Sequence, residues 1–329
     1  MTLHAHLLFD VAAEHLADLR RRLDPDIAIT TGKDLPEGSG VHILVVGRPR
    51  REQLAACPDL RAVIVPWAGI PPETRALLAD FPHISLHNLH HNAIATAETA
   101  MALLLAAAKY VLPLDAALRR HDWTPRYELP DILTLQGRTA LILGFGAIGQ
   151  HLARLCQAFG MQILAIRRRP DAPLPADLRV AVHPPAALPD LLAGSDVLLI
   201  ALPETEETRG WIGADELARM PRGSLLVNVG RGPVVDEQAL FAALQSGHLA
   251  GAGIDVWYAY PASKEERSHT PPSAYPFHEL ANVVLSPHRG GAAGTEETER
   301  QRNAELARLL NAAARGQPLP NQVDLKRGY

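Results

Sequence analysis

Three glycines stand at a spacing that suits the binding of a phosphate-bearing ligand. Gly144, Gly146 and Gly149 form a G-x-G-x-x-G pattern between an apolar run and a stretch with helical periodicity. In the order strand, turn, helix, the first glycine permits a tight turn, the second lets backbone approach a pyrophosphate, and the third allows close helix–strand packing. The phosphates would lie at the positive end of the helix. With Ala147 and Ile148, these glycines predict a dinucleotide site; the alternative is a glycine-rich turn without a ligand.

Three consecutive arginines, Arg167, Arg168 and Arg169, follow the next apolar run, and the first of them stands 18 residues after Gly149. At this position an acidic residue binds the ribose 2′-hydroxyl of NAD, whereas an arginine accommodates the 2′-phosphate of NADP. A guanidinium can bind a phosphate through two parallel hydrogen bonds. The pattern therefore favours NADP(H), with NAD(H) as the second candidate, and a solvated charged loop is the alternative.

Two series of short apolar runs predict the strands that would position these residues. The runs are continuously apolar, which is typical of parallel strands covered by helices on both faces. Helix-like stretches separate them, so the sequence predicts two α/β units. The runs are residues 4–9, 42–47, 61–66 and 83–88 in the first series, and 139–144, 161–166, 178–182, 196–201, 224–229, 251–256 and 282–286 in the second.

Two long helices are expected to connect these units. An alanine- and leucine-rich stretch predicts a helix over 96–111 as the first crossing between them, with Pro113 as its stop signal. A charged helix over 296–315 is expected to return to the first unit. The first domain would then be discontinuous, with residues 1–95 and 293–329, and the second domain would span residues 96–292.

The composition limits the classes of function. The chain has 329 residues, 47% of them hydrophobic, which is enough for two domains with large cores. A net charge of −4 argues against a nucleic-acid or anionic-membrane partner. The N-terminus lacks a signal-peptide pattern, and the longest apolar run, residues 100–108, is too short to cross a bilayer. The only cysteines, Cys57 and Cys156, suggest no metal site and suit a reducing compartment, so a cytoplasmic protein is expected.

Three segments resemble the D-isomer-specific 2-hydroxyacid dehydrogenases, in particular those that reduce glyoxylate or hydroxypyruvate. They are GFGAIGQHLARLCQAFGM from residue 144, the segment 202–256 that contains NVGRG, and VVLSPH from residue 283. The resemblance runs through most of residues 90–329, including the GQPLPNQV tail, and more faintly through the N-terminal part. It implies an α/β fold of two Rossmann-like domains: a doubly wound parallel sheet for the dinucleotide, and a smaller flavodoxin-like substrate domain.

The resemblance also implies a reaction in which a hydride moves between a nicotinamide and the carbon of a 2-keto or 2-hydroxy acid. Arg231 matches the family's arginine, a fixed cation that polarises the carbonyl and holds the carboxylate. His288 matches the family's acid/base, which supplies the proton. The positions that match dinucleotide contacts in the family are Thr96, Pro203, Thr208, Val229, Asp255 and Gly290.

A loop in the N-terminal part resembles the one whose backbone amides bind the substrate carboxylate in the family. It comprises Trp67, Ala68, Gly69 and Ile70. The bulky Trp67 would either limit the substrate pocket or pack under the loop.

Tyr260 departs from the family's pattern, because that position usually holds a glutamate that pairs with the catalytic histidine. A tyrosine cannot supply the carboxylate charge that raises a histidine pKa, so we expect His288 to titrate lower than its counterparts. The Tyr260 hydroxyl could still orient the histidine ring, or Glu265 or Glu266 could replace the missing carboxylate. The segment 261–273 is a second departure, an insertion that would be a lid, an oligomer contact or a plain surface loop.

The sequence thus predicts an NADPH-preferring oxidoreductase that reduces a small 2-keto acid, such as glyoxylate or hydroxypyruvate, to the D-2-hydroxy acid. The long helix and the region of Trp123 resemble the family's dimer-forming region, so a homodimer is expected. One alternative is a dehydrogenase of an atypical acid donor with a modified acid/base pair. The other is a dinucleotide-sensing interaction protein with little activity, which would have no need to keep Arg231 and His288.

Overall fold

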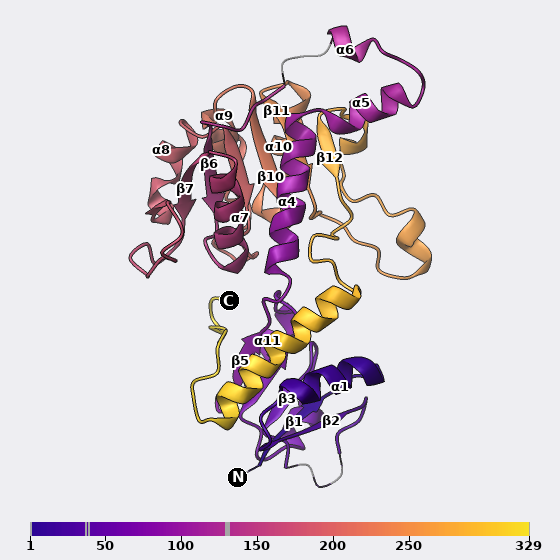
Figure 1. Ribbon diagram of the computed structural model, residues 1–329, viewed down its shortest axis with the longest axis vertical. Helices are drawn as coiled ribbons and strands as arrows, with labels where there is room; N and C mark the ends of the chain where they lie inside the picture. The colour runs from indigo at the N-terminus through magenta and orange to yellow at the C-terminus, as the bar shows by residue number, and fades with distance from the viewer. Residues whose placement is uncertain (1, 37, 39, 129–131, 329) are drawn as a thin grey trace. The chain divides into compact units, whose positions relative to one another are not determined.

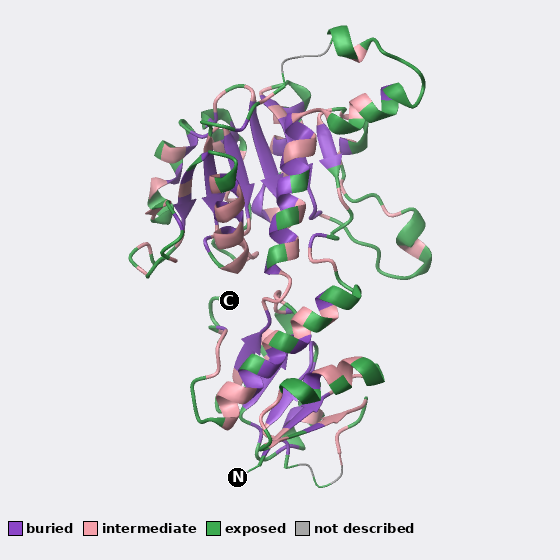
Figure 2. Cartoon of the chain, in the orientation of Figure 1, coloured by how far each residue is buried: buried purple, intermediate pink, exposed green. Residues whose placement is uncertain are grey.

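The continuously apolar runs form two separate parallel sheets, one in each of two units (Figure 1). The computed structural model describes residues 2–36, 38, 40–128 and 132–328. Unit 1 consists of Met1–Asn92 and Ala292–Tyr329, and unit 2 consists of Ala93–Gly291. The strands of both sheets are mostly buried, as Figure 2 shows, because helices cover both of their faces.

Unit 1 contains a five-stranded parallel sheet with the strand order β2-β1-β3-β4-β5. This is the order of flavodoxin-like folds, so the predicted smaller flavodoxin-like domain is confirmed. Its last helix comes from the end of the chain and packs beside its first helix, where Asn303 donates a hydrogen bond to the carbonyl oxygen of His15. The strands are β1 (Leu3–Leu7), β2 (Ile27–Thr31), β3 (Ile43–Val45), β4 (Ala62–Val65) and β5 (Ser85–Asn88); the helices are α1 (Ala13–Arg22), α2 (Arg51–Ala55), α3 (Pro72–Leu78) and α11 (Glu296–Ala314).

Unit 2 contains a seven-stranded parallel sheet with the strand order β12-β11-β10-β9-β6-β7-β8. The order reverses between β6 and β9, which confirms the predicted doubly wound sheet and places its switch point beside the glycine pattern. The strands are β6 (Thr139–Leu143), β7 (Gln162–Ile166), β8 (Ala181–His183), β9 (Val197–Ile200), β10 (Ser224–Asn228), β11 (Leu249–Ile254) and β12 (Val283–Leu285).

The helices of unit 2 form two layers over its sheet. One hydrophobic cluster includes residues of α4 and α7, and the other includes residues of α8, α9 and α10. The helices are α4 (Ala93–Ala108), α5 (Val111–Leu118), α6 (Pro125–Glu128), α7 (Ala147–Ala158), α8 (Leu188–Leu192), α9 (Ala214–Arg219) and α10 (Glu237–Gln245), with short 3₁₀ turns η1 (Pro185–Ala187), η2 (Gly232–Val234), η3 (Glu265–Ser268) and η4 (Phe277–Glu279).

The helix predicted over 96–111 is α4, and its bounds differ by three residues at each end. It ends early because Tyr110 adopts a left-handed backbone conformation with φ of 52°, which a continuous helix excludes. A side chain at Gly253 of β11 would place its Cβ 2.6 Å from the Cβ of Leu103. The glycine therefore lets α4 lie directly on the sheet.

Two strand predictions were inaccurate. The strand β2 had not been predicted, because it is an edge strand in which only Ile29 is buried, so it lacks a continuous apolar run. The strand predicted over 178–182 begins later, as β8. β8 is also an edge strand, at the end of the seven-stranded sheet, and it is short and only half-buried.

Within the described residues, no single helix is long and apolar enough to cross a bilayer. The helices α4 and α5 meet such a length and composition only when taken together, and they are bent by 63° at their junction.

Candidate active site

The glycine turn follows β6 at the switch point of the unit 2 sheet. Gly144 has φ of 93°, and a Cβ there would lie 2.8 Å from the carbonyl oxygen of Ala201. A Cβ at Gly149 would overlap the carbonyl oxygen of Gly144, so both glycines are required by the packing of the chain itself. Gly146 is different, because no described atom lies within 4 Å of the place where its Cβ would be.

Gly146 is also the residue that precedes the first turn of α7. An open position at a helix N-terminus is what a pyrophosphate needs to approach the backbone closely. Ala147 and Ile148 begin the helix, and their N–H groups belong to its unpaired first turn. The residues present therefore fit a dinucleotide.

Arg167 is held inside its own loop. It follows β7, and its Nη2 donates hydrogen bonds to the carbonyl oxygens of Pro170, at 3.0 Å, and of Ala172. Its guanidinium lies over the ring of Phe145 in the glycine turn, 5.9 Å from the ring centroid. Arg167 thus connects the arginine loop with the glycine turn through its contact with Phe145.

Arg168 and Arg169 are exposed, in contrast to Arg167. An Nη1 atom of Arg168 lies 3.9 Å from the carboxylate of Glu207, a residue of the loop that follows β9. This is a long, solvent-exposed ion pair, and such pairs contribute little to stability. Both side chains therefore lie at the surface of the arginine loop.

The loops after β9 and β10 lie against each other at the same carboxyl edge. Thr208 is buried, and its hydroxyl donates to the carbonyl oxygen of Pro203 at 2.7 Å. Val229 is buried after β10, and a Cβ at the next residue, Gly230, would lie 2.5 Å from the carbonyl oxygen of Leu202. Thr96, which was expected at a helix start, lies inside α4 and is buried.

Arg231 follows β10 and is placed by Asn228, the last residue of that strand. The buried side chain of Asn228 donates to the carbonyl oxygen of Arg231 at 2.9 Å and accepts from the N–H of Gly230 at 3.0 Å. The guanidinium of Arg231 donates to the carbonyl oxygen of Gly230 at 2.6 Å. Sequence reasoning missed Asn228, although a polar residue at the end of an apolar strand is a signal for such a role.

Asp255 holds the segment that carries His288. It is 1% exposed, and its carboxylate accepts hydrogen bonds from the Ser286 hydroxyl and from the N–H groups of Arg289 and Gly290, both at 2.9 Å. A Cβ at Gly290 would lie 2.6 Å from this carboxylate, so the glycine permits the contact. Asp255 and Gly290 were predicted as dinucleotide contacts, and within the chain Gly290 donates its N–H to Asp255.

His288 has a left-handed backbone conformation with φ of 57°. Partial burial lowers the pKa of His288, the positive charge of Arg231 lowers it further, and Asp255 opposes them. Arg231, Asp255 and His288 follow β10, β11 and β12, which are neighbouring parallel strands, so the structure places all three at the same edge of the sheet.

Tyr260 lies against His288 through its ring. The two ring centroids are 5.6 Å apart and the planes are inclined by 52°. Its hydroxyl accepts a hydrogen bond from the N–H of Trp257 at 3.0 Å and so is turned toward the backbone. Burial raises the pKa of Tyr260, against the opposite effects of the Trp257 N–H and Arg231. Tyr260 is thus a neutral neighbour of the imidazole.

Neither Glu265 nor Glu266 replaces the missing carboxylate. Glu266 accepts a hydrogen bond from the N–H of Ala262 at 2.9 Å, and Glu265 is hydrogen-bonded by its own N–H and by Ser263. The insertion over 261–273 contains the turn η3, and at its end the Ser273 hydroxyl donates to the carboxylate of Glu237 in α10 at 2.6 Å.

The loop Trp67–Ile70 follows β4 in unit 1. A Cβ at Gly47 would overlap the indole of Trp67, so this ring packs on the backbone after β3, which favours packing under the loop over a role in limiting a pocket. The amide of Asn88 donates to the carbonyl oxygen of Ala68. Within the described chain, the N–H groups of Ala68, Gly69 and Ile70 have no hydrogen-bond acceptor, so three successive donors remain open.

A doubly wound sheet with a glycine turn at its switch point defines unit 2 as a dinucleotide-binding domain of the Rossmann type. Residues 101–290 match the family described as D-isomer specific 2-hydroxyacid dehydrogenase, NAD binding domain. The chain belongs to the D-isomer specific 2-hydroxyacid dehydrogenase family, and unit 2 binds a nicotinamide dinucleotide.

Three relatives show the extent of the similarity. The chain is 40% identical over 235 residues to a glyoxylate reductase of Korarchaeum cryptofilum, which covers 70% of this chain and 65% of that protein. It is 31% identical over 302 residues to a D-3-phosphoglycerate dehydrogenase of Mycobacterium bovis, which covers 89% of this chain and 52% of that protein, so the chain spans about half of its length. A solved D-isomer specific 2-hydroxyacid dehydrogenase of Xanthobacter autotrophicus, in complex with NADPH and MES, is 28% identical with a TM-score of 0.77 and full coverage of both chains.

The charges around His288 predict opposite effects of two substitutions. Arg231→Gln removes the cation that lowers the pKa of His288, so that pKa should rise. Asp255→Asn removes the carboxylate that raises it, so the pKa should fall. The measurement is a pH titration of histidine ring resonances by NMR, with His288→Asn to identify the His288 signal among the 15 histidines.

Two substitutions of Tyr260 are the matched comparison in the same titration. Tyr260→Glu brings a carboxylate toward His288 and should raise its pKa. Tyr260→Phe removes only a hydroxyl that is turned toward Trp257, so the pKa should stay where it is. Equal shifts in these two variants, or a shift of the Arg231 and Asp255 variants in one direction, would contradict the arrangement.

Proposed function

We propose that this protein reduces a small 2-keto acid, of the glyoxylate or hydroxypyruvate kind, to the D-2-hydroxy acid with NADPH as the preferred donor. The observation that carries the proposal is the position of Arg231 and His288 on the loops that follow β10 and β12, at the carboxyl edge of the sheet that bears the open glycine turn. The similarity to proteins named glyoxylate reductase supports the choice of substrate class.

In this reaction the bound dinucleotide supplies the hydride to the carbonyl carbon. Arg231 would hold the keto acid's carboxylate and polarise its carbonyl, because a guanidinium stays charged and can donate two parallel hydrogen bonds. His288 in its protonated form would donate the proton to the developing alkoxide. Since the pKa of His288 is lowered from 6.5, the rate of reduction should fall as the pH rises through that lowered value.

Each of the two domains would bind one of the two reactants. We propose residues 96–292 as the dinucleotide domain, and residues 1–95 with 293–329 as the substrate domain. The three open N–H groups of Ala68, Gly69 and Ile70 suit a carboxylate, since successive backbone donors form an anion-binding concavity. The dinucleotide would contact the glycine turn and the loops of Pro203, Thr208, Val229, Asp255 and Gly290, together with Thr96.

The preference for NADPH would come from Arg168 and Arg169. Their side chains are exposed in the loop that follows β7, and β7 pairs with β6, the strand that precedes the glycine turn. Arg167 donates to two carbonyl oxygens of the same loop. The solved relative from Xanthobacter autotrophicus is a complex with NADPH, which supports this choice of cofactor.

The proposed reaction is tested by oxidation of NADPH and NADH with a panel of 2-keto acids. Turnover is expected with small acids, and Arg231→Gln and His288→Asn should each lower kcat/KM by about 100-fold or more, because each removes a charge or proton donor used in the transition state. NADPH binding to both variants, followed by fluorescence, should be retained. NADPH binding without turnover of any acid would favour the dinucleotide-sensing protein, and turnover of formate or phosphite instead would favour the atypical donor.

The cofactor preference is tested by equilibrium binding. The double variant Arg168→Ala/Arg169→Ala should weaken NADPH binding by about tenfold or more and leave NADH binding unchanged, because charge-assisted bonds to the 2′-phosphate are lost. Arg179→Ala removes an exposed charge of the same domain and is the control. Arg167→Ala should weaken both cofactors alike, since it loosens the glycine turn; equal losses for both cofactors in the double variant would contradict the assignment.

We also propose a homodimer, formed by the arm that follows α4, residues 111–128 together with Ile132. Apolar side chains along this arm are exposed to an extent unusual for a monomer, among them Val111, Leu112, Leu118, Trp123, Tyr127 and Ile132. An obligate contact would bury such a surface.

The dimer is tested by light scattering of the purified chain. The wild type should have about twice the mass of one chain, and Leu118→Glu with Trp123→Ala should convert it to a monomer, because both side chains are at least half exposed on the arm. Leu174→Glu charges an exposed leucine outside the arm and should leave the mass unchanged. A monomeric wild type, or a dimer that survives in the arm variant, would contradict the proposal.

A cytoplasmic location is proposed as well. Both cysteines, Cys57 and Cys156, are buried thiols, as is typical of proteins from reducing compartments. Burial raises the pKa of the Cys156 thiol to about 12, which makes it unreactive.

A further inference from the structure

The C-terminal tail, residues 316–323, follows α11 and runs back along β5 in unit 1 (Figure 1). Gln322 forms an antiparallel bridge with His87 of this strand. Val323 is buried, so this part of the tail is fixed against the sheet. The tail therefore lies beside the carboxyl end of β5, where Asn88 is the last residue.

Asn321 connects the tail with this strand end through both N–H groups of its side-chain amide. One of them donates to the carbonyl oxygen of Asn88 at 3.0 Å, and the other donates to the carboxylate of Glu305 in α11 at 2.9 Å. Asn321 has a left-handed backbone conformation with φ of 57°, which asparagine adopts more readily than most residues. Its amide is thus held between a helix and a strand end, and both of its donors are used.

The hydrogen bond from Asn321 is the first of a chain that ends at the loop proposed to bind the substrate carboxylate. The carbonyl of Asn88 and the N–H of Leu89 belong to one peptide group, and that N–H donates to the carbonyl oxygen of Trp67 at 3.4 Å. The Trp67 carbonyl shares a peptide group with the N–H of Ala68, one of the three open donors of the described chain. Because a trans peptide group is planar, its C=O and N–H point in opposite directions. The bonds to the two carbonyls therefore fix the directions of the Leu89 and Ala68 N–H groups.

The side chain of Asn88 orients the next peptide group of the loop in the same way. Its amide donates to the carbonyl oxygen of Ala68 at 2.5 Å, so the N–H of Gly69 points to the opposite side. Asn88 is 6% exposed, and β5 pairs with β4, the strand that precedes the loop. Two of the three open donors are therefore directed by contacts with the end of β5, which Asn321 holds in turn.

We propose that Asn321 is a positioning residue for the substrate carboxylate and acts through the peptide groups of Asn88 and Trp67. The inference rests on the proposed function, in which the N–H groups of residues 68–70 bind that carboxylate. Hydrogen-bonded groups polarise one another, so each bond of the chain strengthens the donor at its end. Successive N–H groups bind an anion when they converge on it, so the tail would contribute to substrate affinity without touching the substrate.

The proposal is tested with Asn321→Gly, which keeps the left-handed backbone conformation accessible and removes the side-chain amide. With NADPH at saturation, the KM for glyoxylate should rise about five- to tenfold while kcat changes less than about twofold, because the lost bonds act on carboxylate binding rather than on hydride transfer. Gln322→Gly places a glycine at the next, exposed position and is the control, with KM expected at the wild-type value. NADPH binding should be unchanged in both variants.

A second variant separates the loss of the amide from the flexibility of glycine. Asn321→Asp keeps the size of the side chain and its tolerance of this backbone conformation, but a carboxylate cannot donate a hydrogen bond. Its KM should rise at least as far as that of Asn321→Gly. A wild-type KM in either variant would overturn the proposal. Equal changes of KM, kcat and NADPH binding would also overturn it, since they would show a general loosening of the fold.

Binding of oxamate, an unreactive analogue of a 2-keto acid, gives a result that does not depend on turnover. Calorimetric titration of the chain with NADPH bound should show saturable binding, which Asn321→Gly weakens by about the same five- to tenfold. If this pattern is found without turnover of glyoxylate, the proposed reaction fails and the positioning role stands. Turnover with oxamate binding unaffected by Asn321→Gly would give the reverse. Absence of both turnover and oxamate binding would overturn both.

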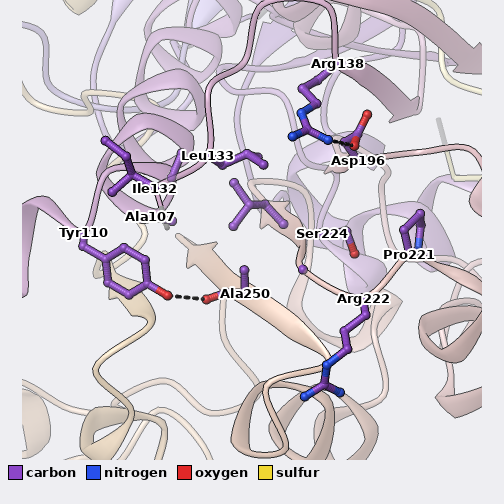
Figure 3. Close-up of a pocket in the computed structure, with 13 residues that line it drawn as sticks. Ala107, Tyr110, Ile132, Leu133, Arg138, Asp196, Pro221, Arg222, Ser224 and Ala250 are labelled. Carbon is purple, nitrogen blue, oxygen red and sulfur yellow. Dashed lines mark hydrogen bonds and ion pairs between the residues drawn. The ribbon is translucent and has the colours of Figure 1, made fainter. Parts of the chain in front are cut away.

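A separate cavity of unit 2 provides the control for the place of binding. It lies at the amino ends of the strands and has a volume of about 330 Å³. Its lining includes Arg138, which is paired with Asp196, and the exposed Arg222 (Figure 3). Arg222→Gln should leave oxamate binding at its wild-type strength. Loss of binding in this variant, with retention in Asn321→Gly, would place the anion in this cavity and overturn the proposal.

Discussion

The carboxyl edge of unit 2 depends on the buried carboxylate of Asp255. It accepts hydrogen bonds from Ser286 on one side of His288 and from Arg289 and Gly290 on the other. Charged acceptors form stronger hydrogen bonds than neutral ones, which offsets the cost of burying the charge. A left-handed conformation at a residue such as His288 costs about 1–3 kcal/mol and persists only where its surroundings fix it. Asp255 provides that constraint from both sides.

Asn228, at the end of the adjacent strand β10, fixes the loop of Arg231 as Asp255 fixes the loop of His288. Each of these two side chains ends or follows a buried strand and bonds back to the loop beyond it. Because β11 lies between β10 and β12 and all three strands are parallel, the loops that carry Arg231, Asp255 and His288 emerge at the same edge. An arginine and a histidine 57 residues apart in sequence thereby come to share one electrostatic environment. Asn228 is neutral, so it positions Arg231 without reducing the charge that an acid would bind.

The sequence predicted most of the sheets because buried parallel strands leave continuous apolar runs, and it predicted the switch point from the spacing of its glycines. It did not predict β2, whose exposed edge allows a mixed composition. Nor did it predict the conformation of Arg167, which depends on the carbonyl oxygens of Pro170 and Ala172 and on the ring of Phe145. The roles of Asn228 and Asp255 were missed for the same reason: hydrogen bonds from a strand end to a following loop leave no periodic pattern.

Tyr260 brings no negative charge to His288, and in the proposed reaction the carboxylate of the substrate would compensate for this. In the free protein, burial and Arg231 lower the pKa of His288, and Asp255 is the carboxylate that opposes them. A keto acid bound to Arg231 would bring a second negative charge into the same group and neutralise the cation that disfavours protonated His288. The substrate itself would then supply the charge that Tyr260 lacks. Since the tyrosine is neutral and its hydroxyl is engaged by Trp257, it places no competing anion beside the imidazole, and the proton donor would be favoured when an acid is present to receive the proton.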